Sequence, residues 1–262
     1  MTGHKGQSIL WALGLWIAWT GATWWLEGRI NTLGRPDAVV ERLIYAILAN
    51  LLIGVLAAGL VLRRRFTIAS AQPRRSGFGP LRRSALFVPA GLAAGLLFYM
   101  AGGAPSLDPV VILNAYAQVF VVSMAEVMVC WAVVAGSVRR SVEYRAWLAV
   151  PAAAIIASVL FGVYHFAHSA PFNTPSMVAF LSVIGLVTSA VFFLTEDLYA
   201  TIAFHNALGT LGIVRALDSA GSLAAFETVQ WPLIATAFAG LCILVAVDVT
   251  VVRPRGFEPR TR

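Results

Sequence analysis

The stretch Leu198–Gly212, LYATIAFHNALGTLG, is an apolar run with an imidazole, His205, in its middle. Its apolar character and length are typical of a buried or membrane-spanning helix. An imidazole surrounded by lipid is costly unless it faces a partner or a water-filled cavity, so an intramembrane histidine indicates a functional site. Two further apolar segments of the chain could supply partners for it.

One of these segments reads SMAEVMVCWAV and carries Glu126, and the other reads SVLFGVYHFAHS and carries His165 and His168. A carboxylate inside a span is disfavoured by several kcal/mol unless it is paired or protonated, so Glu126 indicates either a site or a hydrogen bond between helices. The two histidines share a helix face and could hold a metal, or one could accept a proton. Polar residues follow His168 directly, so we expect His168 at the membrane surface and His165 in the site.

The composition of the chain predicts an integral membrane protein. Of its 262 residues, 59% are hydrophobic and 12% are charged, and the mean hydropathy is +0.81. Soluble domains are about 45–50% apolar and about 25% charged. The net charge of +7 comes from basic clusters at the ends of apolar runs. Such clusters suit topology signals and anionic lipid, so we expect the lipid bilayer and no nucleic acid as a partner.

The apolar runs predict an all-α bundle of about eight transmembrane helices, because a helix needs about 20 apolar residues to cross the hydrocarbon core. The longest run is expected to end at Val134 and to lie partly along the interface. The eight segments are Ile9–Leu26, Leu43–Leu62, Ala85–Met100, Val110–Val134, Ala146–Phe166, Met177–Leu194, Leu198–Val214 and Trp231–Val252.

The basic residues predict the orientation. With eight spans, 15 of the 19 Lys and Arg residues fall on one side. The positive-inside rule then places both termini in the cytoplasm of a cell-membrane protein. The loop 63–83 holds seven of these arginines and is expected to be a mobile basic linker near anionic headgroups, or a topology signal alone. The tail 253–262 is expected to be disordered.

A depth estimate tests whether the candidate residues can meet. At 1.5 Å per residue, Glu126 lies roughly 12 Å and His205 roughly 10 Å from the cytoplasmic face. By the same count His165 lies roughly 22 Å from it, so its contact with Glu126 would need a tilted helix or a helix that begins later.

Residues Val110 to Gly212 also resemble a known family. The pattern F-x-x-x-H at Phe161–His165 precedes His205 by 40 residues, with FLSVIGLVTSAVFFLTEDL between. This order resembles the CPBP membrane proteins, the family of type II CAAX prenyl endopeptidases and bacteriocin-processing or self-immunity proteins. The resemblance divides the chain into N-terminal transmembrane helices with a basic loop (1–109), a motif-bearing core (110–216), and a last helix with a basic tail (217–262).

The resemblance implies an all-helical intramembrane endopeptidase in which glutamates and histidines activate a water molecule. The implied catalytic residues are Glu126, His165 and His205, and the two histidines would be ligands if a divalent metal such as zinc is used. The family motifs are Glu-Glu-x-x-x-Arg, Phe-x-x-x-His and His-x-x-x-Asn or Asp. Here Ala125 stands for the first glutamate, Cys130 for the arginine and Gly209 for the asparagine or aspartate.

Three functions of different classes follow. The first is an intramembrane endopeptidase that hydrolyses a membrane-associated peptide or protein substrate. The second is a catalytically inactive relative, a scaffold or immunity protein, which the altered motifs favour. The third is a proton-coupled carrier that uses the glutamate and histidines as a relay. A nucleophilic Cys130 is disfavoured, because an apolar helix face raises the pKa of a thiol.

Overall fold

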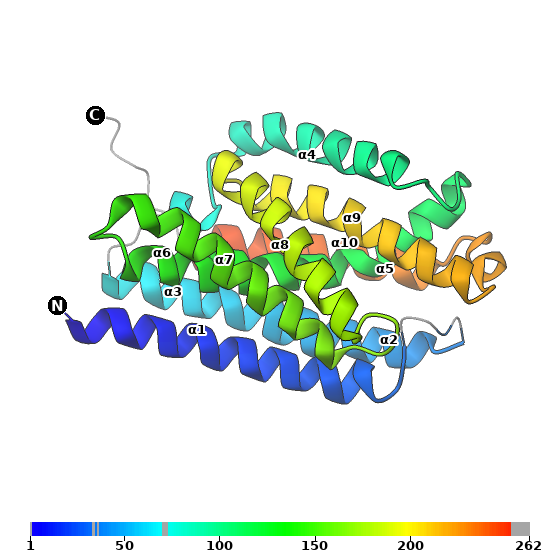
Figure 1. Ribbon diagram of the computed structural model, residues 1–262, viewed down its shortest axis with the longest axis horizontal. Coiled ribbons are helices and arrows are strands. Elements are labelled where there is room, and N and C mark those ends of the chain that lie inside the picture. Colours follow the sequence, from blue (N-terminus) through cyan, green and yellow to red (C-terminus); the bar gives the residue numbers. More distant parts are fainter. Residues whose placement is uncertain (1, 33–34, 36, 70–72, 253–262) are drawn as a thin grey trace.

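The protein is an all-α bundle in the computed structural model, which describes residues 2–32, 35, 37–69 and 73–252. No strand occurs within these ranges. Helix α1 lies along one edge of the bundle and α4 along the opposite edge, beside α9 (Figure 1). The elements, with short π- or 3₁₀-helical segments labelled η, are α1 (Thr2–Thr23), η1 (Trp24–Gly28), α2 (Val39–Tyr45), η2 (Ala46–Ala57), α3 (Ala58–Ala69), η3 (Pro73–Ser76), α4 (Leu81–Ala101), α5 (Pro109–Glu126), η4 (Val127–Ala135), α6 (Gly136–Ser141), α7 (Ala146–Tyr164), η5 (His165–Ala167), α8 (Pro175–Thr195), α9 (Leu198–Ser219), η6 (Leu223–Phe226), α10 (Trp231–Ala246) and η7 (Val247–Val252).

Within the described ranges, seven helices are long and apolar enough to cross a membrane. The expected seventh span, Leu198–Val214, forms α9, a continuous helix of 22 residues that is not among the seven. Polar side chains such as His205, Asn206 and Arg215 lower its hydropathy. The all-α, polytopic architecture is confirmed.

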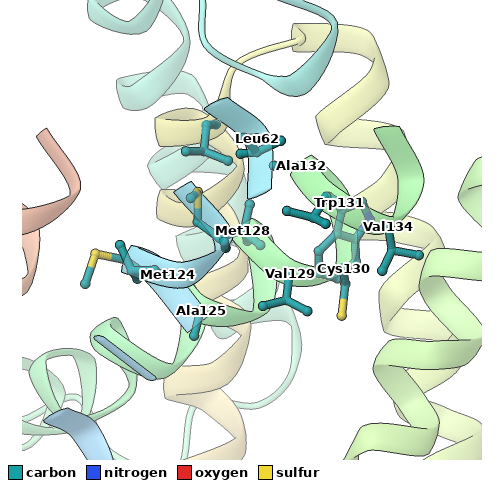
Figure 2. Packing of buried hydrophobic residues seen from close by; sticks show 14 of the residues in the cluster. Leu62, Met124, Ala125, Met128, Val129, Cys130, Trp131, Ala132 and Val134 are labelled. Carbon is teal, nitrogen blue, oxygen red and sulfur yellow. The ribbon is translucent and has the colours of Figure 1, made fainter. Parts of the chain in front are cut away.

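The central helix of the bundle is the continuous run Pro109–Ser141, made of α5, η4 and α6. Its most apolar window is 89% buried, against 50% or less for the other six. Figure 2 shows side chains of this helix, including Met128 and Trp131, packed in a buried cluster with Leu62 of α3. The helix continues past Val134 to Ser141, so the expected end was wrong.

Small residues let neighbouring helices approach closely, as is common in membrane bundles. A Cβ built on Gly54 of η2 would collide with the Cβ of Ala125 on the central helix. A Cβ built on Gly95 of α4 would likewise collide with the Cβ of Ala207 on α9. These two contacts hold the central helix and α9 firmly between their neighbours.

The basic loop is packed where the structure describes it, so the expectation of a mobile linker was wrong there. Arg65 is buried and donates to the hydroxyl of Ser76. Phe78 lies in the core, and the carbonyl of Gly77 accepts a hydrogen bond from the amide of Leu198 over 2.8 Å. The loop therefore seals the start of α9. Residues 70–72 and the tail 253–262 lie outside the described residues.

Candidate functional site

The three residues expected to form a site meet inside the bundle. Glu126 is the last residue of α5, and its Oε2 lies 2.9 Å from Nε2 of His205 on α9. Its other oxygen, Oε1, lies 3.6 Å from Nε2 of His165, which follows the last residue of α7. The exposed fractions of Glu126, His165 and His205 are 5%, 7% and 4%. The two carboxylate oxygens therefore face two different imidazoles.

The mismatch in the depth estimate between Glu126 and His165 comes from the length of the central helix. The central helix continues to Ser141, which moves Glu126 about 10 Å further from the end of its helix. Asp197, which caps the start of α9, is fully buried within the bundle. The Asp197 carboxylate accepts from the amide of Ala200 over 2.8 Å and from the hydroxyl of Ser84 over 2.6 Å.

Thr188 of α8 orients the imidazole of His205. Its Oγ1 lies 3.0 Å from Nδ1 of His205. A carboxylate only accepts hydrogen bonds, so beside an ionised Glu126 the proton of His205 is on Nε2. Nδ1 of the neutral ring then accepts from the Thr188 hydroxyl, and both nitrogens of His205 are engaged.

His165 holds the opposite tautomer. Its Nδ1 lies 2.9 Å from the carbonyl oxygen of Phe161, one turn earlier in α7. A carbonyl only accepts, so Nδ1 carries the proton and Nε2 of the neutral ring carries a lone pair. That lone pair faces Oε1 of Glu126. Two acceptors face each other here across 3.6 Å.

Aromatic rings surround these polar groups. Trp131 lies with its ring centroid 5.4 Å from that of His205, and Phe161 lies 4.7 Å from His165 and 5.1 Å from His205. Tyr164 stacks on Trp19 of α1 at 3.7 Å. The Trp131 indole donates to Ser189 of α8 over 2.8 Å, which fixes this wall. The site is therefore a small polar cluster in an apolar and aromatic enclosure.

His168 directly follows the span Trp147–Ala167 and is buried within the bundle, with an exposed fraction of 3%. Its expected place at the membrane surface stays a prediction. The chain turns at η5, which contacts η1. The ring stacks on that of His165, with centroids 5.1 Å apart. Burial lowers the pKa of His168 below its usual range. Neither ring nitrogen has a hydrogen-bond partner among the described residues.

Glu27 is a buried carboxylate that the sequence reading missed. It lies in η1, and its Oε2 accepts from the amide and the hydroxyl of Thr32 over 2.6 and 2.9 Å. Its Oε1 accepts from the hydroxyl of Ser169 over 2.6 Å and lies 3.9 Å from Nδ1 of His168. The predicted first span ends at Leu26, one residue before Glu27. The sequence signal for a buried carboxylate is that Glu27 directly follows the apolar run WWL.

The altered motif positions are closely packed. Ala125 is fully buried against Gly54, and Cys130 is fully buried in the core of the bundle. A Cβ on Gly209 would lie 2.9 Å from Cγ1 of Val119 on α5. The neighbouring Asn206 instead joins α9 to α5, because its Oδ1 accepts from Ser123 over 3.1 Å.

A carboxylate and two imidazoles at these distances could take a proton from water or hold a metal ion. The resemblance implies His165 and His205 as ligands if a metal is used. Among the described residues, however, the group in which one ligand atom of each residue lies within 4.8 Å of the others is Glu126, His165 and His168. Comparisons with protein-family models, curated proteins and solved structures found no match to this chain.

Proposed function

We propose that this chain is an intramembrane endopeptidase in which Glu126 activates a water molecule. The observation that carries the proposal is the carboxylate of Glu126 between two imidazoles, buried in a bundle of apolar helices. A buried ionisable cluster of this kind is costly in lipid and is a functional site by default. The resemblance of Phe161–His165 and His205 to the CPBP motifs favours peptide-bond hydrolysis over other chemistry.

The reaction begins with a water molecule beside Oε1 of Glu126 and Nε2 of His165, both of which are acceptors. Glu126 takes a proton from this water as the oxygen attacks the carbonyl carbon of the substrate. The Nε2–H of His205, which is released as Glu126 becomes protonated, stabilises the resulting oxyanion. When the C–N bond breaks, the glutamic acid returns its proton to the leaving amine. A divalent metal such as zinc, when bound, would polarise the water or the carbonyl.

The expected substrate is a membrane-associated peptide or protein, because the site lies within the apolar bundle. We place both termini in the cytoplasm of the cell membrane. The support is the positive-inside rule together with contacts that gather the basic segments at one end of the bundle. Arg65 and Ser8 both contact Ser137, and Arg139 pairs with Glu196 over 3.3 Å.

A catalytically inactive relative, such as a scaffold or immunity protein, is the second candidate, and the packing at Ala125 favours it. The Ala125 side chain lies directly against Gly54, where a built Cβ would come within 2.3 Å of the Cβ of Ala125. The bundle is thus built around the absence of the first family glutamate. Such a protein would bind a peptide at the Glu126 site without cleaving it.

The test uses the full chain in proteoliposomes with a panel of prenylated peptides and leader peptides, with products detected by mass spectrometry. We expect cleavage by the wild type and a loss of about 100-fold or more in Glu126→Gln, since general-base catalysis contributes about 10²–10⁴. Glu227→Gln, at an exposed glutamate, is the matched control and should cleave normally.

Two results would contradict the proposal. Cleavage that is unchanged in Glu126→Gln would remove the role of this carboxylate. A folded wild type that binds a panel peptide but cleaves none would favour the inactive relative.

A further inference from the structure

The imidazole of His168 is buried, and neither of its ring nitrogens has a hydrogen-bond partner among the described residues. A buried N–H or lone pair without a partner costs about 1–3 kcal/mol, so such groups are rare in folded proteins. An imidazole in this position is explained if one nitrogen binds a ligand. The ring stacks on that of His165, and Nε2 of His165 faces Oε1 of Glu126.

The second observation is the pair of acceptors at His165 and Glu126. Nε2 of His165 and Oε1 of Glu126 are 3.6 Å apart, which is too long for a direct hydrogen bond. Two ligands of one tetrahedral zinc ion lie roughly 3.4 Å apart, given metal–ligand distances of about 2.0–2.2 Å. A lone pair and a carboxylate oxygen at this separation fit a shared cation better than each other.

We propose that Glu126, His165 and His168 together bind a divalent transition-metal ion, with His168 as the third protein ligand. One possible ligand atom from each of the three residues lies within 4.8 Å of those of the other two. Two histidines and a glutamate form a ligand set of catalytic zinc sites that leaves a coordination position open. The inference does not depend on peptidase activity, because an inactive protein could bind the same ion.

The surroundings of the three ligands match the supporting hydrogen bonds that metal sites require. The Phe161 carbonyl fixes Nδ1 of His165 over 2.9 Å, which points Nε2 at the site. His205 donates to Oε2 of Glu126, which leaves Oε1 for the ion. Glu27 lies 3.9 Å from Nδ1 of His168, where it can orient that ring once Nδ1 is protonated.

His205 is assigned to this supporting set and not to the ligands. Its Nε2 is engaged with Glu126 and its Nδ1 with Thr188, so neither nitrogen is left for a cation. The proposed ligand set therefore differs from the pair implied by the resemblance, because His168 replaces His205.

The experiment uses the full-length protein in detergent, stripped with a chelator and titrated with Zn²⁺ or Co²⁺. We expect one equivalent per chain, and zinc-edge X-ray absorption should show two imidazoles with oxygen ligands. His168→Gln should weaken binding by more than about 100-fold. His205→Gln should keep one equivalent, with an affinity about 10–100-fold weaker, as for other supporting residues. Tyr164→Phe, whose ring contacts both histidines but offers no ligand, should bind as the wild type does.

Three results would overturn the metal site: no binding to the folded wild type at about 1 mM metal, unchanged affinity in His168→Gln, or three imidazoles in the absorption spectrum. The spectrum needs only the wild type, so it decides the matter even if His168→Gln does not fold. An inert protein that binds one ion keeps this inference and loses the peptidase, whereas cleavage by a metal-free protein that binds no ion does the reverse.

Discussion

The hydroxyl of Ser169 donates to Oε1 of Glu27 over 2.6 Å and so joins residues 142 positions apart in the chain. This bond ties the loop after α7 to the end of α1. The same carboxylate accepts twice from Thr32. Glu27 therefore fixes the loop that carries His168 into the bundle.

Glu27→Gln should destabilise the protein. An amide nitrogen in place of one carboxylate oxygen would face a donor, either at Thr32 or at Ser169, and leave it unpaired. Losing a charged, buried hydrogen bond costs about 1–3 kcal/mol, which we expect as a lower midpoint of thermal unfolding in detergent. Glu41→Gln is the control in the neighbouring helix α2, and an equal fall in both variants would contradict the role of Glu27.

Thr188→Val should lower peptidase activity without preventing folding. Valine has nearly the same shape, but it removes the hydrogen bond to Nδ1 that orients the imidazole of His205. We expect about a tenfold fall in kcat, measured with the peptide that the wild type cleaves best. Thr236→Val is the control, because the Thr236 hydroxyl donates to Pro232 O within its own helix. Normal activity in Thr188→Val would show that the hydrogen bond from Thr188 to His205 is not needed for catalysis.

Gly54→Ala should be much more harmful than Gly21→Ala. The added methyl group at position 54 collides with Ala125, whereas nothing lies within 4 Å of a Cβ at Gly21. Overpacking of this kind costs typically about 1–3 kcal/mol. The measurement is the midpoint of thermal unfolding of the two variants, side by side. Equal midpoints would mean that η2 and the central helix are less tightly packed than described.

Ala125→Glu should not restore a family-like active site. Its larger side chain would enter the contact with Gly54, so we expect low yield and aggregation on size-exclusion chromatography. Ala125→Gly is the control, since it removes an atom from the same contact. If Ala125→Glu folds and gains peptidase activity, the close packing is wrong and the wild type is an inactive relative.

The sequence predicted the helices from the length of the apolar runs, which is a local signal. It also predicted that Glu126, His165 and His205 form one site, although the depth estimate left His165 too far from Glu126. It missed Glu27 and the burial of His168 within the bundle, since both depend on how the loop after α7 folds against α1 and η1. Polar neighbours such as Ser169 looked like a surface segment. In the structure the Ser169 hydroxyl instead satisfies a buried carboxylate.

The π-stacked pair Trp19 and Tyr164 has a consequence for how the chain is handled. The Trp19 ring belongs to the N-terminal part of the chain, and the Tyr164 ring contacts His165 in the part that carries the candidate site. A fragment that begins near residue 110 would lack both the Trp19 ring and the Glu27 carboxylate. The polar cluster would then be open to acyl chains. We therefore expect residues 110–216 to unfold together with the N-terminal helices as one cooperative unit, and to be inert when expressed alone.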